Sequence, residues 1–169
     1  MKKIAEVMAG YQIYHTKQIT KLTHYFGVSI ITLSLLILFS WIKLSVIGHE
    51  ISFTWLGIIL LMAYYLYLDL KLGLLTAVIF IVCAFIAQLI AQHNQNLFGL
   101  MIFFALFIIG AALQMIGHQY EGNRPAFLEN AYQVFVAPIF IIAEWTFALG
   151  YRKELEKDVL QEMEKLKIH

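Results

Sequence analysis

The chain alternates long apolar runs with short polar breaks, and this pattern predicts helices that cross a membrane. Four runs carry little or no charge. At 1.5 Å per residue, each would form a helix that spans, or nearly spans, a hydrocarbon core of about 30 Å. We expect these four spans at Tyr25–Ile47, Ile51–Leu68, Leu72–Ala91 and Leu97–Ile116.

A fifth apolar run covers residues 131–149, but Gln133, Pro138 and Glu144 interrupt it. This run either crosses the membrane or enters it and returns. The connections between the first four runs are only three to five residues long. Consecutive spans are therefore expected to be antiparallel neighbours in a tight bundle. The predicted fold is an all-α polytopic membrane bundle with four spans and a fifth apolar helix.

The two ends of the chain differ from the bundle. Residues 1–24 are mixed and partly amphipathic, which indicates a surface segment, and residues 25–149 form the bundle itself. Residues 150–169 carry charges of both signs around one apolar stripe, which is typical of a solvated or interfacial amphipathic helix. We interpret residues 1–169 as one membrane domain.

Composition excludes two other classes of protein. The chain is 61% hydrophobic and only 14% charged, with a mean hydropathy of +0.76, whereas soluble domains are about a quarter charged. Its net charge is +1 and it has no broad basic stripe, so nucleic acid is not an expected partner. The single cysteine, Cys83, can form no internal disulfide.

Basic residues predict the orientation. The first 24 residues contain four lysines, and Lys71 and Arg124 return to the same side after two and four crossings. We expect that side to be cytoplasmic, in a bacterial plasma membrane or, in a eukaryote, in the endoplasmic reticulum. The five Lys and Arg residues of the tail would lie on the opposite side if the fifth run crossed fully, which conflicts with the rule.

Histidines are the strongest candidates for chemistry in this apolar chain. His15 and His24 precede the first span and His118 follows the fourth, so an even number of crossings places all three at one membrane face. Three neutral imidazoles can bind iron, zinc or copper, and by themselves they do not select the metal. His49 and His93 lie in loops on the far side, and His169 is the last residue.

His15 and His24 are nine residues apart, so on one straight helix they would point in different directions. A common metal requires a break in the helix, which we expect at Thr20, whose hydroxyl can cap a new helix start. The alternative is that the two histidines cap helices or lie among lipid headgroups.

Other polar residues surround these histidines in sequence. Glu121 can share a helical face with His118. Asn123 and Arg124 could meet a carboxylate, or Arg124 could reach a lipid phosphate. Glu144 lies inside an apolar run and needs a partner, which could be a metal, a metal-bound histidine or Arg124.

Three segments resemble the membrane-embedded 2-hydroxy fatty acid dioxygenases of fatty-acid alpha-oxidation, formerly an uncharacterised family. In the first, YHTKQITKLTHYFG, the family's Tyr-His, His and Gly fall in register, and Thr20 replaces its Asn. In the second, QMIGHQYEGNRPAFLEN, Glu121 follows His118 by three residues, where the family has four. The third, APIFIIAEWTFALGYR, aligns Glu144 with the family's intramembrane Glu.

This resemblance implies an iron(II)-dependent dioxygenase that uses O₂ to shorten a 2-hydroxy fatty acid by one carbon. It implies that His15, His24 and His118 bind the iron, with Glu144 or Glu121 as a fourth ligand or as an acceptor for an imidazole. Arg124 or a lysine would neutralise the substrate carboxylate. Orientation of the hydroxyl would fall to Tyr14, Tyr120 or Asn123.

Other functions make different predictions. A di-iron hydroxylase would need more histidines than the six present, and the chain has no His-Glu-x-x-His motif for a zinc protease. A haem-binding cytochrome could use His15 or His24 with His118. A small transporter or structural membrane protein would place polar residues opposite one another at mid-bilayer.

Overall fold

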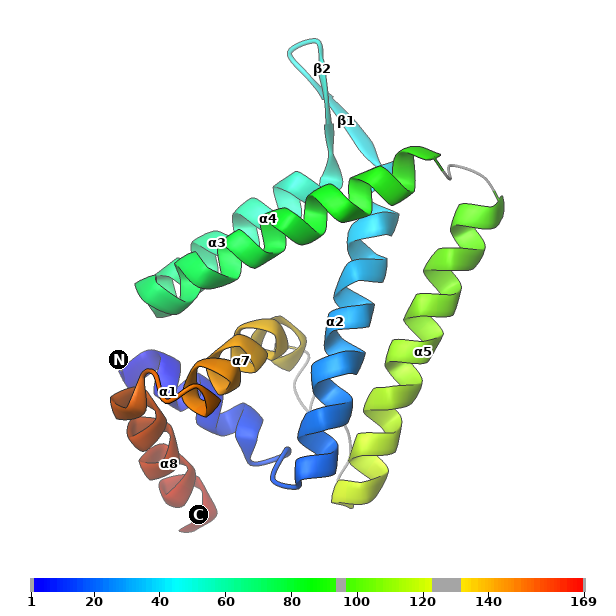
Figure 1. The fold of residues 1–169 in the computed structure, drawn as a ribbon. Coiled ribbons are helices and arrows are strands. Elements are labelled where there is room, and N and C mark those ends of the chain that lie inside the picture. Colours follow the sequence, from blue (N-terminus) through cyan, green and yellow to red (C-terminus); the bar gives the residue numbers. More distant parts are fainter. Residues whose placement is uncertain (1, 94–96, 123–131, 169) are drawn as a thin grey trace.

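The computed structural model describes residues 2–93, 97–122 and 132–168. These residues are helical apart from one β-hairpin and the connecting turns, which confirms the predicted helical fold (Figure 1). In chain order the elements are α1 (Lys2–Gln12), α2 (Gln18–Trp41), β1 (Lys43–Val46), β2 (His49–Ser52), α3 (Phe53–Leu68), α4 (Leu70–His93), α5 (Leu97–Glu121), α7 (Gln133–Ala148) and α8 (Lys153–Ile168).

Helices α2 and α5 form the central pair and lie side by side along most of their lengths (Figure 1). Glycines permit this close approach. A Cβ atom added at Gly27 would lie 2.8 Å from the carbonyl oxygen of Gly110, and one added at Gly110 would lie 2.8 Å from that of Gly27. Because the two helices run in opposite directions, the start of α2 meets the end of α5.

Helices α3 and α4 form a second pair, which packs on α2 (Figure 1). At the turn between them, the side chain of Asp69 accepts a hydrogen bond from the Leu72 backbone N–H at 2.9 Å. The predicted antiparallel pairing is therefore confirmed for these two helices. It is wrong for α4 and α5, which diverge in Figure 1, because α5 packs on α2 instead.

A β-hairpin replaces the predicted end of the first span. Helix α2 ends at Trp41, and Lys43–Val46 pairs with His49–Ser52 around a turn in which Ile47 and Gly48 have φ values of 50° and 79°. The reason is local. Polar and apolar side chains alternate in KLSV, which favours a strand, and Gly48 suits the left-handed turn.

Three of the described helices are long and apolar enough to cross a membrane, namely α2, α5 and residues 70–92 of α4. Helices α3 and α7 have 16 residues each, which gives them a length of about 24 Å. The structure therefore does not confirm four spans, although it retains five apolar helices.

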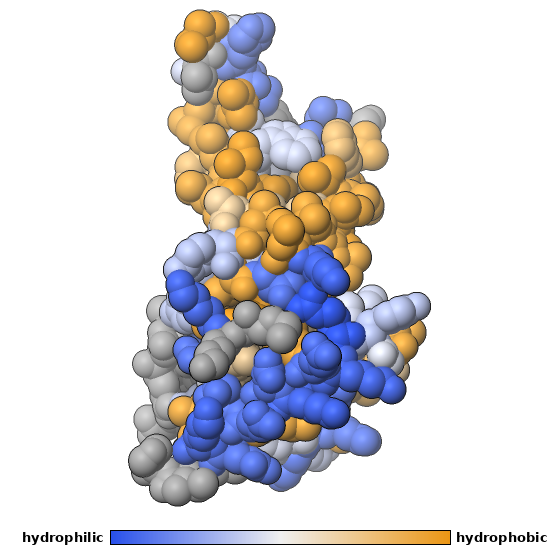
Figure 2. All heavy atoms as spheres, turned by 90° about the vertical axis from the view of Figure 1, so that its left-hand side faces the viewer, coloured by the Kyte–Doolittle hydropathy of each residue, from blue (hydrophilic) through white to orange (hydrophobic). Residues whose placement is uncertain are grey.

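Helices α1, α7 and α8 lie together at the lower left of the molecule in Figure 1. Helix α8 packs on α1 and buries Leu155, Val159 and Met163, which confirms that the tail is an amphipathic helix. Figure 2 shows hydrophilic side chains gathered on this lower part and apolar side chains above it. The exposed apolar residues of α4 are suited to contact with lipid and include Leu74, Val78, Val82, Phe85 and Leu89.

Candidate metal centre

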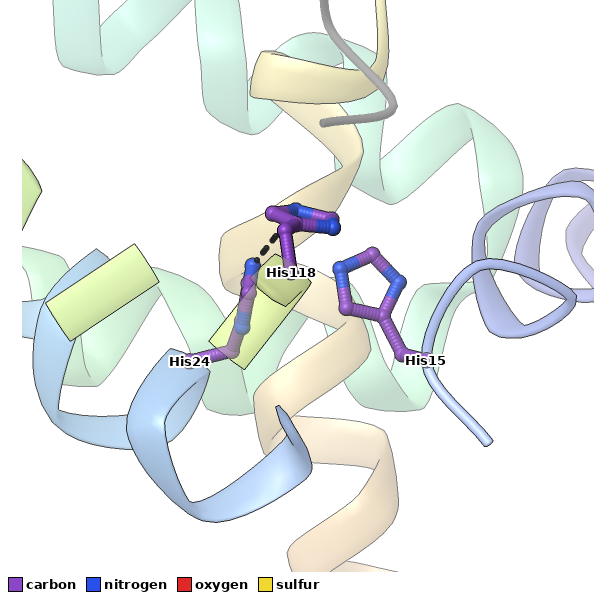
Figure 3. A group of neighbouring side chains, drawn as sticks. All are labelled: His15, His24 and His118. Atoms are coloured by element: carbon purple, nitrogen blue, oxygen red, sulfur yellow. Dashed lines mark hydrogen bonds between the residues drawn. The ribbon is translucent and has the colours of Figure 1, made fainter. Parts of the chain in front are cut away.

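Three histidines from three parts of the chain converge at the end of the central helix pair (Figure 3). His15 lies between α1 and α2, His24 lies in α2, and His118 lies in the last turn of α5. Each offers a ring nitrogen, and these atoms all lie within 4.8 Å of one another. The three residues are 1%, 3% and 5% exposed, respectively. The predicted convergence is therefore present in the structure.

The break that allows His15 and His24 to meet is not at Thr20, as predicted, but in residues 13–17. Backbone hydrogen bonds from Tyr14 to Tyr11 and from His15 to Gln12 close the turn there. Thr20 lies inside α2, and its hydroxyl donates to α5, at 3.0 Å to the Gly117 carbonyl and 2.6 Å to Glu121. Thr20 therefore joins the two helices and does not cap one.

Backbone carbonyl groups orient two of the imidazoles. The Nδ1 atom of His15 lies 2.8 Å from the Tyr11 carbonyl oxygen, and that of His24 lies 2.8 Å from the Thr20 carbonyl oxygen. Since a carbonyl only accepts, each Nδ1 carries the proton and each Nε2 keeps a free lone pair. Metal-binding histidines commonly have this arrangement.

The surroundings of His15 keep it uncharged. Its ring stacks on Tyr11, with ring centroids 4.2 Å apart and an angle of 7° between the planes. Burial, with the neighbouring His24 and His118, lowers the pKa of His15 from 6.5 to about 3. At neutral pH His15 is therefore the neutral imidazole that a metal requires.

The histidines leave buried nitrogen atoms without hydrogen-bond partners. His15 Nε2 and His118 Nδ1 are both buried and unpaired among the described residues. The Nε2 atoms of His24 and His118 are 3.1 Å apart (Figure 3). Two nitrogens bound side by side to one ion at about 2.1 Å would be about 3.0–3.4 Å apart. The residues therefore fit a divalent transition metal.

Glu121 contacts the backbone at the start of α2. Its carboxylate accepts hydrogen bonds from the backbone N–H groups of Thr16 at 2.9 Å and Lys17 at 3.0 Å, and also from the hydroxyls of Thr16 and Thr20. These N–H groups have no partner within α2, so a carboxylate from α5 caps the helix. Glu121 thereby connects the His15 segment to the helix that carries His118.

Glu144 has partners that we did not predict. Its carboxylate lies 2.6 Å from Lys21 Nζ and 3.2 Å from the Tyr25 hydroxyl, and it is not part of the group of three histidines. Lys21 is one turn before Tyr25 on α2, so both reach α7. The pair could not be found from sequence because 123 positions separate the two charges.

Of the other predicted site residues, the structure describes Tyr14 and Tyr120. Tyr120 is exposed, and its carbonyl accepts a hydrogen bond from Lys17. Tyr14 is half-buried in the turn before α2. Asn123 and Arg124 lie outside the described residues, as does His169, and His49 is exposed in β2. The roles of Tyr14, Tyr120, Asn123 and Arg124 remain predictions.

An apolar cavity of about 490 Å³ extends from the histidines between α2, α3, α5 and α7. Ligand pockets usually have volumes of this order. Sequence reasoning missed several polar residues in its lining, among them Tyr11, Gln114 and Gln133. For Gln114 a signal existed, because it precedes His118 by four residues and shares its helical face.

Comparison with known proteins identifies the family. Residues 1–149 match the family described as 2-hydroxy-palmitic acid dioxygenase Mpo1-like. The chain belongs to this family. A curated relative is the 2-hydroxy-palmitic acid dioxygenase MPO1 of Saccharomyces cerevisiae, which is 30% identical over 158 residues, covering 91% of this chain and 86% of the relative. No solved structure matches.

The match to the Mpo1-like family covers all three histidines and every helix that lines the cavity. It ends at residue 149, before α8. The family assignment therefore applies to the part of the chain that builds the histidine cluster, and it indicates an enzyme of the dioxygenase class.

Proposed function

We propose that this protein is an iron(II)-dependent dioxygenase that shortens 2-hydroxy fatty acids by one carbon. One observation carries the proposal: three buried histidines lie at one end of a long apolar cavity within a membrane protein. The name of the family and that of the yeast relative support the same substrate class.

The overall reaction balances with one molecule of oxygen. A 2-hydroxy acid and O₂ would give the acid one carbon shorter, carbon dioxide and water. Iron(II) held by His15, His24 and His118 would supply the redox chemistry and positions open to oxygen and substrate. The protein must hold the three imidazoles neutral and oriented, and the carbonyls of Tyr11 and Thr20 do this for His15 and His24.

The cavity is suited to a long acyl chain. Apart from the histidines and a few hydroxyl and amide groups, its lining is aliphatic and aromatic. On α2 the lining extends from His24 to Phe39, which is about 22 Å along the helix axis. A substrate with its carboxylate and 2-hydroxyl near the histidines would place its tail along this wall and remain shielded from water.

A haem site accounts for less of the cluster. A haem-binding cytochrome would use His15 or His24 with His118 and would leave the third buried imidazole without a role. A transporter gives no reason for three buried imidazoles, two of which have a buried nitrogen without a partner among the described residues. Both alternatives predict that no shortened acid forms.

The test is turnover by protein purified in detergent and supplied with iron(II), oxygen and a long-chain 2-hydroxy acid. We expect the acid one carbon shorter, and we expect no product under nitrogen or with a chelator. Both the carboxylate and the 2-hydroxyl would be recognised, so an acid without the hydroxyl should react very poorly. Equal turnover of 2-hydroxy and 3-hydroxy acids would contradict the proposal.

A further inference from the structure

The end of the cavity farthest from the histidines is formed by one face of α3. Tyr65 and four earlier residues of this helix line the cavity, and the four have the i, i+3, i+4 and i+7 spacing of a single helical face, namely Thr54, Gly57, Ile58 and Leu61. The opposite wall at this end includes Leu35, Leu36 and Phe39 of α2. An occupant that extends from the histidines along α2 would therefore meet this face of α3.

Gly57 differs from Gly27, Gly73, Gly110 and Gly117, which lie inside helices α2, α4 and α5. A Cβ added at Gly27, Gly73, Gly110 or Gly117 would lie between 2.3 and 2.8 Å from a neighbouring atom, so packing requires glycine there. A Cβ added at Gly57 would have no heavy atom within 4 Å. Packing therefore does not explain this glycine, although glycine in a helix costs about 1 kcal/mol relative to alanine.

The face that carries Gly57 is held in place against α2. The Thr54 hydroxyl donates to the Leu36 carbonyl oxygen at 3.0 Å and lies 3.1 Å from the Ser40 hydroxyl. Thr54, Leu36 and Ser40 are all buried, and Thr54 and Leu36 also line the cavity. Since α3 is anchored one turn before Gly57, a side chain added at Gly57 would extend into the cavity instead of displacing the helix.

We propose that Gly57 sets the longest acyl chain that the cavity accepts, by leaving space for the methyl end of the substrate. The inference rests on the proposed function, because it takes the substrate's polar end to lie at the histidines. A larger side chain at position 57 would occupy the volume taken by the last few methylene groups of a long acyl chain. Shorter acids would not extend as far as this side chain.

The experiment compares kcat/KM for saturated 2-hydroxy acids of increasing length in the wild type, Gly57→Ala and Gly57→Leu. For Gly57→Leu we expect the ratio of long-chain to short-chain kcat/KM to fall about tenfold or more, since one misplaced methylene in a tight pocket already costs about tenfold. Gly57→Ala, the milder change, should shift the ratio in the same direction by less.

The matched control is Leu60→Phe on the same helix. Leu60 is 73% exposed and does not line the cavity, so added bulk there should leave the ratio unchanged. If Gly57→Leu does not fold, the ratio of long-chain to short-chain kcat/KM in Gly57→Ala tests the proposal instead. An unchanged ratio in a folded Gly57 variant, or an equal shift in Leu60→Phe, would overturn the proposal.

A binding measurement separates this inference from the proposed function. Displacement of a bound fluorescent fatty acid by the same 2-hydroxy acids reports the chain-length limit without turnover. If the wild type forms no shortened acid, but Gly57→Leu selectively loses binding of the longest acids, the proposed reaction fails and the role of Gly57 stands. If the wild type reacts and neither turnover nor binding changes with chain length in Gly57→Leu, the role of Gly57 fails alone.

Discussion

At the residue scale, the hydrogen bonds of each histidine determine what it can do. His15 and His24 each donate from Nδ1 to a backbone carbonyl, which leaves Nε2 as the ligand atom. His118 has an unpaired Nδ1 and contacts His24 through Nε2. The site is therefore oriented mainly by main-chain carbonyl groups of α1 and α2.

Replacing any one of the three histidines should remove the metal. We expect His15→Ala, His24→Ala and His118→Ala each to lose most of the bound iron and nearly all turnover, because two imidazoles bind a divalent ion much more weakly than three. Elemental analysis of purified protein measures the loss. His49→Ala is the control, since His49 is exposed in β2. Full iron content in His118→Ala would rule out this centre.

Glu121 is expected to act through position and not as a ligand. Glu121→Gln keeps the shape of the side chain but removes the negative charge that caps the start of α2. We therefore expect the free energy of unfolding to fall by about 1 kcal/mol. Amide hydrogen exchange at Thr16 and Lys17 should become faster, because their N–H groups donate to this carboxylate. Exchange on the exposed face of α4 should not change. Unaltered exchange at both amides would show that Glu121 does not hold this segment.

At the element scale, the crossing of α2 and α5 positions two of the three histidines. His24 and His118 meet because Gly117 allows the helices to touch. A Cβ added at Gly117 would lie 2.3 Å from Thr23 Oγ1 and 3.1 Å from His24 Nδ1. The contact with Thr23 is too short to persist, so the Thr23 side chain or the helix pair would have to move at the histidine end.

Gly117→Ala should therefore weaken the metal site without removing any ligand. We expect iron affinity to fall by about tenfold or more, as it does when groups that orient ligands are disturbed. Removing the Thr23 hydroxyl in Gly117→Ala/Thr23→Ala relieves the shorter contact and should restore part of the affinity, while Thr23→Ala alone should change it little. A double variant no better than Gly117→Ala would mean that the contact with Thr23 is not the cause.

At the scale of the whole molecule, the two ends of the chain lie together at the histidine end. Helix α8 packs on α1, and Arg152 forms an ion pair with Asp69 at the turn between α3 and α4. After α7 the chain therefore returns to α1 and to the turn between α3 and α4. In a membrane, this arrangement would place the basic residues of the tail on the same side as the lysines of the first segment, as the orientation rule requires.

The ion pair between Asp69 and Arg152 should make stability depend on pH. Burial alone would raise the pKa of Asp69, but hydrogen bonds from Arg152 and from the Leu72 N–H outweigh it and hold the pKa below the ordinary 3.8. A lowered carboxyl pKa stabilises the fold above the unfolded value, and this contribution is lost as the pH falls through the folded value.

Asp69→Asn should therefore lower stability by about 1 kcal/mol at neutral pH, a typical value for a partly exposed pair. The difference in Tm between this variant and the wild type should shrink as the pH falls below 3.8. Lys43→Met is the control, because its pair with Glu50 is exposed on the hairpin. A Tm difference that stays constant across this range would mean that the charge of Asp69 does not contribute.

The sequence by itself determined the class of fold and the three metal-binding candidates. Long apolar runs in a chain with so little charge can be stable only as membrane helices. The even number of runs between His24 and His118 was enough to place these residues at one end. These inferences need only periodicity and counting, which are local properties of the chain.

Tertiary structure alone decided which polar groups meet. The pairing of Glu144 with Lys21 and the capping of α2 by Glu121 join residues more than 100 positions apart, and no local pattern encodes such contacts. The return of the chain to α1 after α7 also depended on tertiary packing, because α8 buries its apolar side against α1. The physical reason is that a buried charge or an uncapped helix end must find a partner, but the partner is chosen by which helices touch.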